Sequence, residues 1–574
     1  MLEYPKEKSI TCKENQCYLS FEKRIDDFVK NYLSGYFPIK ANKNKVIHDP
    51  VWGTTLFYKW ELQILDSPLL QRLRDISQLG LTMLTYPTAH HTRFEHTLGV
   101  MSVITKMVNN INQSDDSSKI VEYDLYELRL AALLHDIGHC FFSHLSESIY
   151  GKLKDFVELK KSFYIFKTAK EHEIFAYIII NSPTFKSFIK KNVELWTNGI
   201  DLDALFMRIG FMIVGATLPY VEVSGGGYER KNYMTQMING QYDADKLDYL
   251  RRDSYTAGLA LTYDIDRFLY KIKIVNRDEN IAEKRVTAKH LVIPISGVSA
   301  VEEMAFSQLM LASYIYQHQK VLATDAIIHD IVEGLMINGK LEHPCDFLYY
   351  CDSDILGLFS KNPDEEFKFS MSQKSFDAVS DKKISDVVKG LRNRELPKRA
   401  FIVNYAVVTD LNHDKQYKVS DIADRLKKIN YLRDEIYNLS VEISNKLPKE
   451  IGGRKHIDFY DIYISIPKTS IAKDLSNALV LTNNKKFVNL SEIVRLSDWA
   501  DAFAWHKWNA YVFAKADILP IVSIASKIAF ERHGLRFDEE KVFTALSNER
   551  EVKKLVTWLK ENDAYPNIGK SATK

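Results

Sequence analysis

The stretch RFEHTLGV at residues 93–100 decides the fold of this chain. It contains the start of a row spaced by four, three and four positions: His96, Val100, Val103 and Met107. Residues at these spacings share one face of an α-helix, so the pattern predicts a helix from residue 93 to about residue 110. Because the rest of the row is apolar, we expect His96 to face the interior of the protein.

A second stretch, LHDIGH at residues 134–139, ends another predicted helix. That helix begins near Asp124, a plausible N-cap, and carries a row that is apolar up to its last member: Leu125, Leu128, Ala132 and His135. We therefore expect the polar groups of His135 and Asp136 to point inward. A third predicted helix, residues 243–258, has polar residues in two adjacent rows: Asp245, Asp248 and Arg252, and Lys246, Tyr249 and Asp253.

The remaining pattern predicts a mainly α chain with a smaller α+β part. We expect an N-terminal extension over residues 1–43, a helical domain over 44–360 and a C-terminal α+β lobe over 361–574, because polar residues mark a boundary near residue 361. Within the lobe we predict strands at FIVNYAVV (401–408) and DIYISIP (461–467), and helix over 497–533. The glycine-rich stretch 221–240 lacks the Lys-Ser/Thr of a phosphate-binding loop and predicts a plain loop.

Composition and charge match a soluble globular protein of several domains. The chain has 574 residues, of which 46% are hydrophobic and 26% charged, and this excludes collagen-like and disordered classes. The net charge is +2, so a polyanion would have to bind at a local site. No segment approaches the roughly 20 apolar residues of a membrane span, so we expect a cytoplasmic protein with no membrane partner. Its five cysteines are too scattered for a disulfide framework.

Four residues have the chemistry of a metal site: His96, His135, Asp136 and Asp245. Two imidazoles and two carboxylates suit Mn, Fe, Zn or Co, whereas an all-oxygen set would favour Mg or Ca. A single buried histidine is more often an ordinary core residue, but burying two carboxylates without a cation is costly. We therefore expect the three predicted helices to hold one divalent transition metal.

Further polar residues in the same segments suggest acid and base chemistry. Glu147 follows His144 by one helical turn, and a carboxylate there orients a histidine and raises its pKa, which suits proton donation to a leaving oxygen. Arg93 precedes His96 by three residues, and His172 lies between two glutamates. The alternative is that His144 and Glu147 form a surface pair without a chemical role.

These residues belong to a longer ordered series, in which the chain resembles the HD-domain phosphohydrolases. Within them it resembles the deoxynucleoside triphosphate triphosphohydrolases, the group of the bacterial dGTPases and the SAM- and HD-domain dNTPase. The series covers about residues 44–320 and adds to the stretches above VIHDPVWG (46–53), DSP (66–68), QRLR (71–74), QLG (78–80), FSH (142–144), HE (172–173), DKLDY (245–249) and RD (252–253). The resemblance implies an HD-domain helical core and hydrolysis of a dNTP at the α-phosphorus, releasing deoxynucleoside and inorganic triphosphate.

The resemblance also implies roles for single residues. The metal would be held by His96, His135, Asp136 and Asp245, and an additional Mg would accompany the nucleotide. The phosphates would contact Arg93, Lys246 and Tyr249. His144 would be the general acid, with Glu147 where the family usually has Asp and with His172 nearby. Gln78 and Asp253 would bind the sugar 3′-hydroxyl, and Leu79 and Tyr316 would crowd the 2′ position and so favour deoxyribose.

Relatives in this group work as tetramers or hexamers, some with nucleotides between subunits. The resemblance therefore implies a homo-oligomer that GTP or a dNTP activates. The residues that match an activator site are Lys45, Val46, Asp66, Gln71 and Arg74. The alternative for Asp66 is an ordinary helix start, because Ser67 and Pro68 follow it.

Several positions depart from the family pattern. Cys140-Phe141 replaces the usual Gly-Pro, and Gln308 and Ala312, on a helix predicted over 308–320, stand where relatives often carry Arg and His. Gln308 and Ala312 leave open an HD-domain nucleotidase that acts on a monophosphate or a signalling nucleotide. Local basic pairs such as Lys160-Lys161 leave open a second alternative, a module that senses nucleotides or binds nucleic acid with little turnover.

Overall fold

The computed structural model describes residues 16–38, 43–114, 117–197, 199–223, 226–261, 263–281, 283–337, 339–357, 382–409, 419–469, 473–544, 546 and 548–567. They form two compact units. The first takes its residues from 1–308, 333–378 and 474–495, and the second from 309–332, 379–473 and 496–574. Helices make up most of both units, so the mainly α fold class is confirmed.

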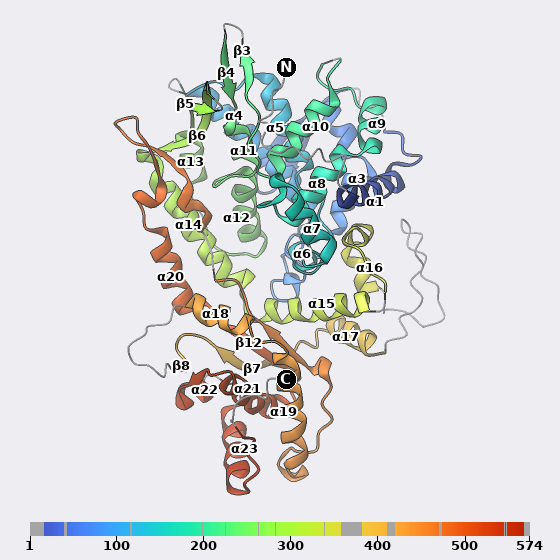
Figure 1. Ribbon diagram of the computed structural model, residues 1–574, viewed down its shortest axis with the longest axis vertical. Helices are drawn as coiled ribbons and strands as arrows, with labels where there is room; N and C mark the ends of the chain where they lie inside the picture. Colours follow the sequence, from blue (N-terminus) through green and yellow to red (C-terminus); the bar gives the residue numbers. More distant parts are fainter. Residues whose placement is uncertain are drawn as a thin grey trace. The chain divides into compact units, whose positions relative to one another are not determined.

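The core of the first unit is built around α4 (Arg93–Gln113), which packs against α5 (Glu122–Leu134) and α12 (Ala244–Thr256) (Figure 1). A capping box of Thr92 and Glu95 starts α4, because the side chain of each residue accepts the backbone N–H of the other. These are the three helices predicted from the sequence. Further helices of this unit include α2 (Lys59–Leu65), α3 (Pro68–Gln71), α6 (His144–Tyr150), α7 (Lys154–Ser162), α8 (Glu171–Asn181), α9 (Pro183–Asn192), α10 (Leu202–Ile213), α11 (Asn232–Ile238), α13 (Ile265–Lys271) and α16 (Asp352–Gly357).

The N-terminal extension contains a helix that the sequence analysis missed, α1 (Gln16–Leu33). Its buried face includes Phe21, Ile25 and Phe28, and it packs against α8 and α9. The spacing of these residues by four and three is helical, but charged residues between them gave the segment a polar composition.

Two sheets belong to the first unit. In one, β1 (Lys45–Asp49) pairs antiparallel with β2 (Gly53–Phe57). The other has the order β11-β10-β6-β4-β3, with β5 also on β6, and its strands are β3 (Val221–Val223), β4 (Gly227–Arg230), β5 (Lys273–Ile281), β6 (Lys284–Pro294), β10 (Leu479–Leu481) and β11 (Phe487–Asn489). The prediction of a loop over residues 221–240 is therefore wrong, since β3, β4 and α11 occupy most of this stretch.

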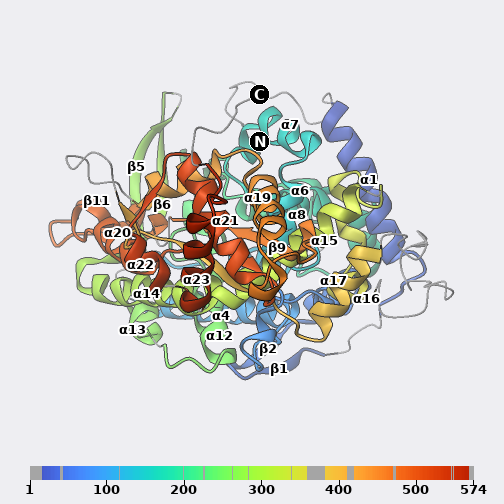
Figure 2. The ribbon, with the colours of Figure 1, turned by 90° about the horizontal axis from the view of Figure 1, so that it is seen from below.

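The second unit packs helices against a small sheet of the order β7-β12-β9. Its strands are β7 (Lys398–Val403), β12 (Ala510–Ala514) and β9 (Ile462–Ser465), and a further pair is β8 (Val408–Thr409) with β13 (Arg536–Phe537). Its helices include α17 (Lys382–Arg392), α18 (Val419–Lys427), α19 (Leu432–Lys446), α20 (Leu496–Lys507), α21 (Leu519–Arg532), α22 (Glu539–Thr544) and α23 (Glu549–Glu561). Figure 2 shows α19 and α21 close together, and both contact this sheet.

Two helices predicted for the later part of the chain need correction. Residues 497–533 are not one helix, because the fully buried strand β12 separates α20 from α21. Its sequence AYVFA is apolar on both faces and cannot be distinguished from a buried helix by periodicity. The predicted helix 308–320 is also interrupted, by a π-helical segment, Ala312–Tyr316, between α14 (Val298–Leu311) and α15 (Gln319–Ile337). Within the described ranges, no helix has the length and apolar character needed to cross a membrane.

Candidate metal centre and active site

Helix α4 brings His96 and Arg93 into the interior of the first unit. Both side chains are almost fully buried, at 0% and 3% exposure. They lie in the first turn of a helix whose remaining inner face is apolar, as the spacing predicted. The helix therefore delivers a histidine and an arginine to one buried place.

The end of α5 supplies His135 and Asp136. His135 is the C-cap residue of this helix, and its Nδ1 lies 2.8 Å from the carbonyl oxygen of Ala132. A carbonyl accepts only, so Nδ1 carries the proton and Nε2 keeps its lone pair. The Nε2 atom lies 3.3 Å from Asp136 Oδ1.

The start of α12 adds the fourth candidate ligand, Asp245. Asp243 caps this helix through the backbone N–H of Lys246, which fixes the direction of the first turn. Asp245 Oδ1 lies 3.0 Å from His96 Nε2, and Asp136 Oδ2 lies 3.7 Å from the same nitrogen. The side chains from the three helices thus meet around His96 Nε2.

This arrangement fits a divalent transition metal. The ligand atoms of His96, His135 and Asp136 lie within 4.8 Å of one another, and both Nε2 atoms are buried without a hydrogen-bond partner in the described structure. Burial lowers the pKa of His96, but the nearby carboxylates of Asp245 and Asp248 outweigh it and raise this pKa to about 10. The surroundings therefore favour a positive charge at this position, which a metal ion also supplies.

Asp248 orients His96, a role that the sequence analysis did not assign. Its Oδ2 lies 2.7 Å from His96 Nδ1 and its Oδ1 accepts the indole N–H of Trp52 at 2.5 Å. Arg252 donates to both oxygens, at 2.8 and 3.0 Å, and also pairs with Asp49 at 2.9 Å. The position of Asp248 one turn after Asp245 was the only signal in the sequence.

Gly99 makes room for this support of the metal centre. A Cβ atom at this position would lie 1.9 Å from Asp248 Oδ1 and 2.3 Å from Arg252 Nη2. Any side chain there would push α12 away from α4. The glycine in RFEHTLGV is therefore required by the close approach of the two helices.

Replacing Trp52 with phenylalanine should weaken metal binding. The variant keeps the ring that Arg251 stacks on but removes the N–H that holds Asp248, so His96 loses part of its orientation. Outer-shell partners of this kind contribute about 10-fold to 100-fold to metal affinity, and we expect the lower end. Isothermal titration of the metal-free protein with Mn²⁺ or Co²⁺ measures the change. The matched control is Trp60→Phe, another buried tryptophan, and equal affinities of the two variants would contradict the assignment.

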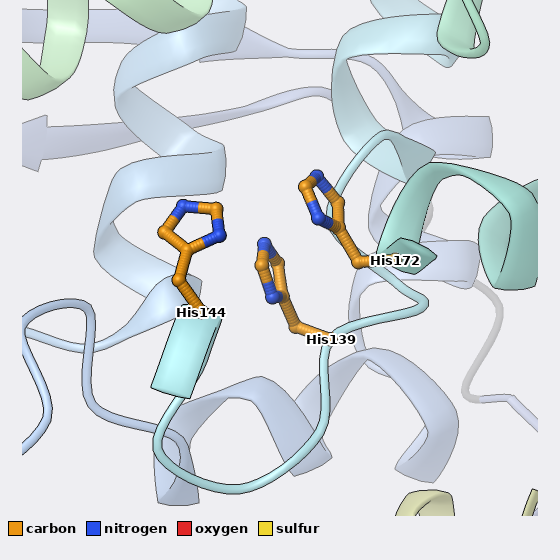
Figure 3. Close-up of side chains that lie close together, drawn as sticks. All are labelled: His139, His144 and His172. Atoms are coloured by element: carbon orange, nitrogen blue, oxygen red, sulfur yellow. The ribbon is translucent and has the colours of Figure 1, made fainter. Parts of the chain in front are cut away.

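A group of three histidines lies next to the candidate metal ligands: His139, His144 and His172 (Figure 3). Glu147 joins two of them, because its Oε2 lies 2.5 Å from His144 Nδ1 and its Oε1 lies 2.9 Å from His172 Nδ1. The Nε2 atoms of both rings are left for other contacts. His144 is 58% exposed, whereas His172 is buried, so His144 is the member that a substrate reaches from solvent.

The histidine group is better suited to handling protons than to holding a second metal. The rings of His139 and His172 are stacked, with centroids 3.8 Å apart and planes at 16°, so their in-plane lone pairs run nearly parallel and do not meet at one ion. Burial lowers the pKa of His139, and partial loss of water around the ring lowers the pKa of His144 although 58% of its side chain is exposed. Burial also acts on His172, but Glu147 outweighs it and raises the pKa of His172. Neighbouring histidines therefore differ in basicity.

The residues predicted to bind phosphate lie around the same centre. Arg93 donates from Nη1 to Asp136 and from Nε to Ser143, both at 2.9 Å, while its buried Nη2 has no hydrogen-bond partner in the described structure. Lys246 Nζ contacts Asp243 and the carbonyl of Gly240, both at 2.7 Å. The hydroxyl of Tyr249 accepts from Gln308 at 3.1 Å. Arg93 thus keeps one donor free for a ligand.

The sequence analysis missed one cation of this region, Lys170. It is the N-cap residue of α8, directly before the Glu-His-Glu stretch, and its Nζ lies 3.8 Å from Glu173. Burial lowers the pKa of Lys170, but the charges of Glu173 and Asp245 outweigh it and raise this pKa. The charge of Lys170 thus acts on a candidate metal ligand, although 52% of its side chain is exposed.

The residues predicted to bind the sugar are partly brought together. Gln78 is buried, and its Oε1 has no hydrogen-bond partner in the described structure, whereas Leu79 beside it is half-buried. Asp253 Oδ1 lies 2.8 Å from Nε2 of the buried His91, which the sequence analysis did not single out. Tyr316 lies in the second unit, at the end of its π-helical segment.

The predicted activator residues lie on two neighbouring parts of the first unit. Lys45 and Val46 are exposed on β1, and Val46 pairs across the sheet with Leu56. Asp66 is the C-cap of α2, and the Nε of Arg74 donates to Gln71 at 2.7 Å. Arg74 also stacks on Phe94, which precedes His96 by two residues. The departure Cys140-Phe141 is fully buried and leads into the turn before His144.

Comparisons with known proteins match this region. A family model described as HD domain matches residues 93–250, from the start of α4 to the interior of α12. The uncharacterized protein YwfO of Bacillus subtilis is 30% identical over 385 residues, which are 62% of this chain and 72% of that protein.

Two further relatives carry a name that states an activity. The deoxynucleoside triphosphate triphosphohydrolase SAMHD1 of Homo sapiens is 27% identical over 307 residues, 52% of this chain and 46% of that protein. Its homolog from Dictyostelium discoideum is 25% identical over 446 residues, 76% of this chain and 75% of that protein. The chain spans about half the length of several of the relatives it matches.

Proposed function

The chain belongs to the HD-domain family, and from this premise we propose that it is a metal-dependent phosphohydrolase that cleaves dNTPs to deoxynucleoside and inorganic triphosphate. The observation that carries the proposal is the meeting of four candidate ligands from three helices, next to a free arginine donor and a histidine paired with a carboxylate. The relatives named as dNTP triphosphohydrolases support the substrate class.

The metal would be held by His96 and His135 through Nε2 and by Asp136 and Asp245. When bound, Mn, Fe, Zn or Co at this place supplies positive charge that polarises a phosphate and lowers the pKa of water. Arg93 Nη2 would donate to a phosphate oxygen, and Lys246 and Tyr249 would line the remaining phosphates. These contacts neutralise charge that grows on the phosphate during the reaction.

His144 would act as the general acid. Its Nδ1 faces Glu147, so the proton that it donates is at Nε2, and the side chain as a whole is 58% exposed. Glu147 and His172 keep the ring in this orientation, because the carboxylate bridges both imidazoles. The 5′ oxygen of the leaving deoxynucleoside would receive the proton, which avoids the release of an alkoxide.

The direct test is product analysis. Purified protein with Mn²⁺ is incubated with each dNTP, and the products are separated by anion-exchange chromatography. We expect free deoxynucleoside and inorganic triphosphate. Release of dNMP and pyrophosphate, or no release, would overturn the proposal.

A nucleotide with fewer phosphates is the second candidate substrate. Lys246 is already paired with Asp243, and Gln308 replaces a cation and binds Tyr249 instead. Both features leave less positive charge for a triphosphate tail. Including dNMPs and cyclic or other signalling nucleotides in the same panel distinguishes the two substrate classes. A module with little turnover, which senses nucleotides or binds nucleic acid, would bind without product.

Activation and assembly are also part of the proposal. The exposed Lys45 and Val46, with Asp66, Gln71 and Arg74, would bind GTP or a dNTP as activator, and the C-terminal lobe over residues 361–574 would serve regulation and the formation of a tetramer or hexamer. The rate of turnover and, by light scattering, the molar mass of the protein are measured with and without added GTP or dNTP. A rate and a molar mass that do not change when the nucleotide is added would contradict this part.

Replacing His91 with glutamine should raise KM for the nucleotide more than it lowers kcat. His91 holds Asp253, the proposed partner of the 3′-hydroxyl, and the loss of a buried hydrogen bond to a charged group costs about 1.5–3 kcal/mol, or roughly 10-fold to 100-fold in binding. Steady-state kinetics with a dNTP and its 3′-deoxy analogue measure the change. If His91 acts through Asp253, the variant affects the dNTP but not the analogue, and an equal loss for both would show that it does not.

A further inference from the structure

The two residues that directly precede His144 have a left-handed backbone conformation, which is unfavourable for residues other than glycine. Phe142 has φ of 51°, and Ser143 has φ of 53° with ψ of −124°. Neither is glycine, and such positions persist only where the surrounding contacts determine them. The sequence FSH therefore places His144 by means of a turn that must be held from outside.

The group that holds the turn is the carboxylate of Asp352, at the start of α16. Its Oδ1 accepts the backbone N–H of Phe142 at 2.6 Å, and its Oδ2 accepts the backbone N–H of Ser77 at 2.9 Å. Asp352 is 8% exposed, and it lies 210 residues from Phe142 and 275 from Ser77 in the chain. Burial raises its pKa to about 6, so a carboxylate is kept here at a cost.

The same carboxylate joins two parts of the proposed active site. Ser77 precedes Gln78, the proposed ligand of the 3′-hydroxyl, and Phe142 and Ser143 precede His144. Ser143 closes the connection, because its hydroxyl donates to the carbonyl of Ser77 at 2.6 Å and accepts from Arg93 at 2.9 Å. A displacement at Asp352 would therefore move the sugar-binding segment and the acid together.

We propose that Asp352 is a positioning residue, which holds the strained turn Phe142–Ser143 and thereby places His144 against the segment of Gln78. The effect on the position of His144 follows from the contacts alone. The effect on catalysis rests on the proposed function.

The variant Asp352→Asn tests the proposal. Both oxygens of the carboxylate accept a backbone N–H, whereas an amide has one oxygen and one NH₂ group, so its NH₂ would face a second donor. The matched control is Asp346→Asn. Asp346 is also buried, and its Oδ2 accepts two backbone N–H groups, from Glu342 at 3.0 Å and His343 at 2.9 Å, in a turn before α16. A general loss of a buried carboxylate affects both variants, whereas a loss of positioning affects only the first.

Two measurements separate the position of His144 from turnover. In protein labelled with ¹³C-histidine, the ε1 resonance of His144, assigned through His144→Gln, should shift or broaden in Asp352→Asn and stay unchanged in Asp346→Asn. In kinetics, kcat of Asp352→Asn should fall on the order of 10²-fold, as misplacement of a catalytic group by about 1 Å does, with metal content unchanged.

An unchanged His144 resonance in Asp352→Asn, or an equal shift in the control, would overturn the proposal. If the wild-type protein cleaves no nucleotide, the proposed function fails, but the resonance still decides the positioning role. If Asp352→Asn does not fold, Asp352→Glu replaces it, because it keeps the charge and moves the carboxylate by one methylene. If neither variant folds while Asp346→Asn does, Asp352 is structural and the proposal is wrong.

Discussion

His135→Ala should lose the bound metal and turnover together. The Nε2 atom of His135 is buried and directs its lone pair toward Asp136. Alanine removes this nitrogen without leaving a buried charge unpaired. Since even outer-shell partners contribute about 10-fold to 100-fold to metal affinity, the loss of a ligand should exceed 10²-fold. Metal content is measured by elemental analysis after dialysis, and turnover by release of deoxynucleoside.

Asp136→Ala should also lose metal and turnover, but it should in addition destabilise the protein. Its carboxylate pairs with Arg93 at 2.9 Å, so its removal leaves a buried guanidinium without its partner, which costs about 3–5 kcal/mol. The melting temperature of the metal-free variants should therefore fall much more for Asp136→Ala than for His135→Ala. Retention of metal or activity by either variant would contradict the ligand assignment.

His144→Gln should lower kcat while metal binding persists. Glutamine can occupy the place of the imidazole but does not donate a proton as an acid, and a general acid contributes about 10²-fold to 10⁴-fold. KM should change little if the residue acts in the chemical step. Normal activity of His144→Gln, with metal bound, would show that another group protonates the leaving oxygen.

The pH dependence gives a second measure of the same role. An acid must be protonated, and partial desolvation of its ring lowers the pKa of His144, so kcat should fall as pH rises through a pKa below the ordinary value of 6.5. Glu147 opposes this shift by stabilising the protonated ring. Glu147→Gln should therefore move the descending limb of the pH profile to lower pH. A limb that stays in place would show that His144 is not the group that titrates.

That the four candidate ligands face the interior could be predicted from the sequence because helical periodicity is local. His96 starts an apolar row, His135 ends one, and Asp245 lies in a polar row near the start of a third helix. A side chain on the apolar face of an amphipathic helix must face the core. The helical pattern alone therefore predicts that the candidate ligands lie in the protein interior. The resemblance to a known family then gave their order a chemical meaning.

Periodicity failed where burial was complete or where composition hid it. The strand Ala510–Ala514 is apolar on both faces, and α1 has charges between its buried residues, so neither showed the pattern that was sought. Both errors lie outside the metal centre. They concern elements whose partners are remote in the chain, and only those partners decide between helix, strand and extension.

What the sequence by itself determined is the mainly α fold and the residue types that face its core. Only the tertiary structure decided which atom of each side chain is presented: Asp248 turns His96 so that Nε2 faces the ligands, and Asp352 holds the turn before His144 from more than two hundred residues away. The physical reason is range. Periodicity repeats within a few residues, whereas hydrogen bonds join groups that meet only after the chain has folded.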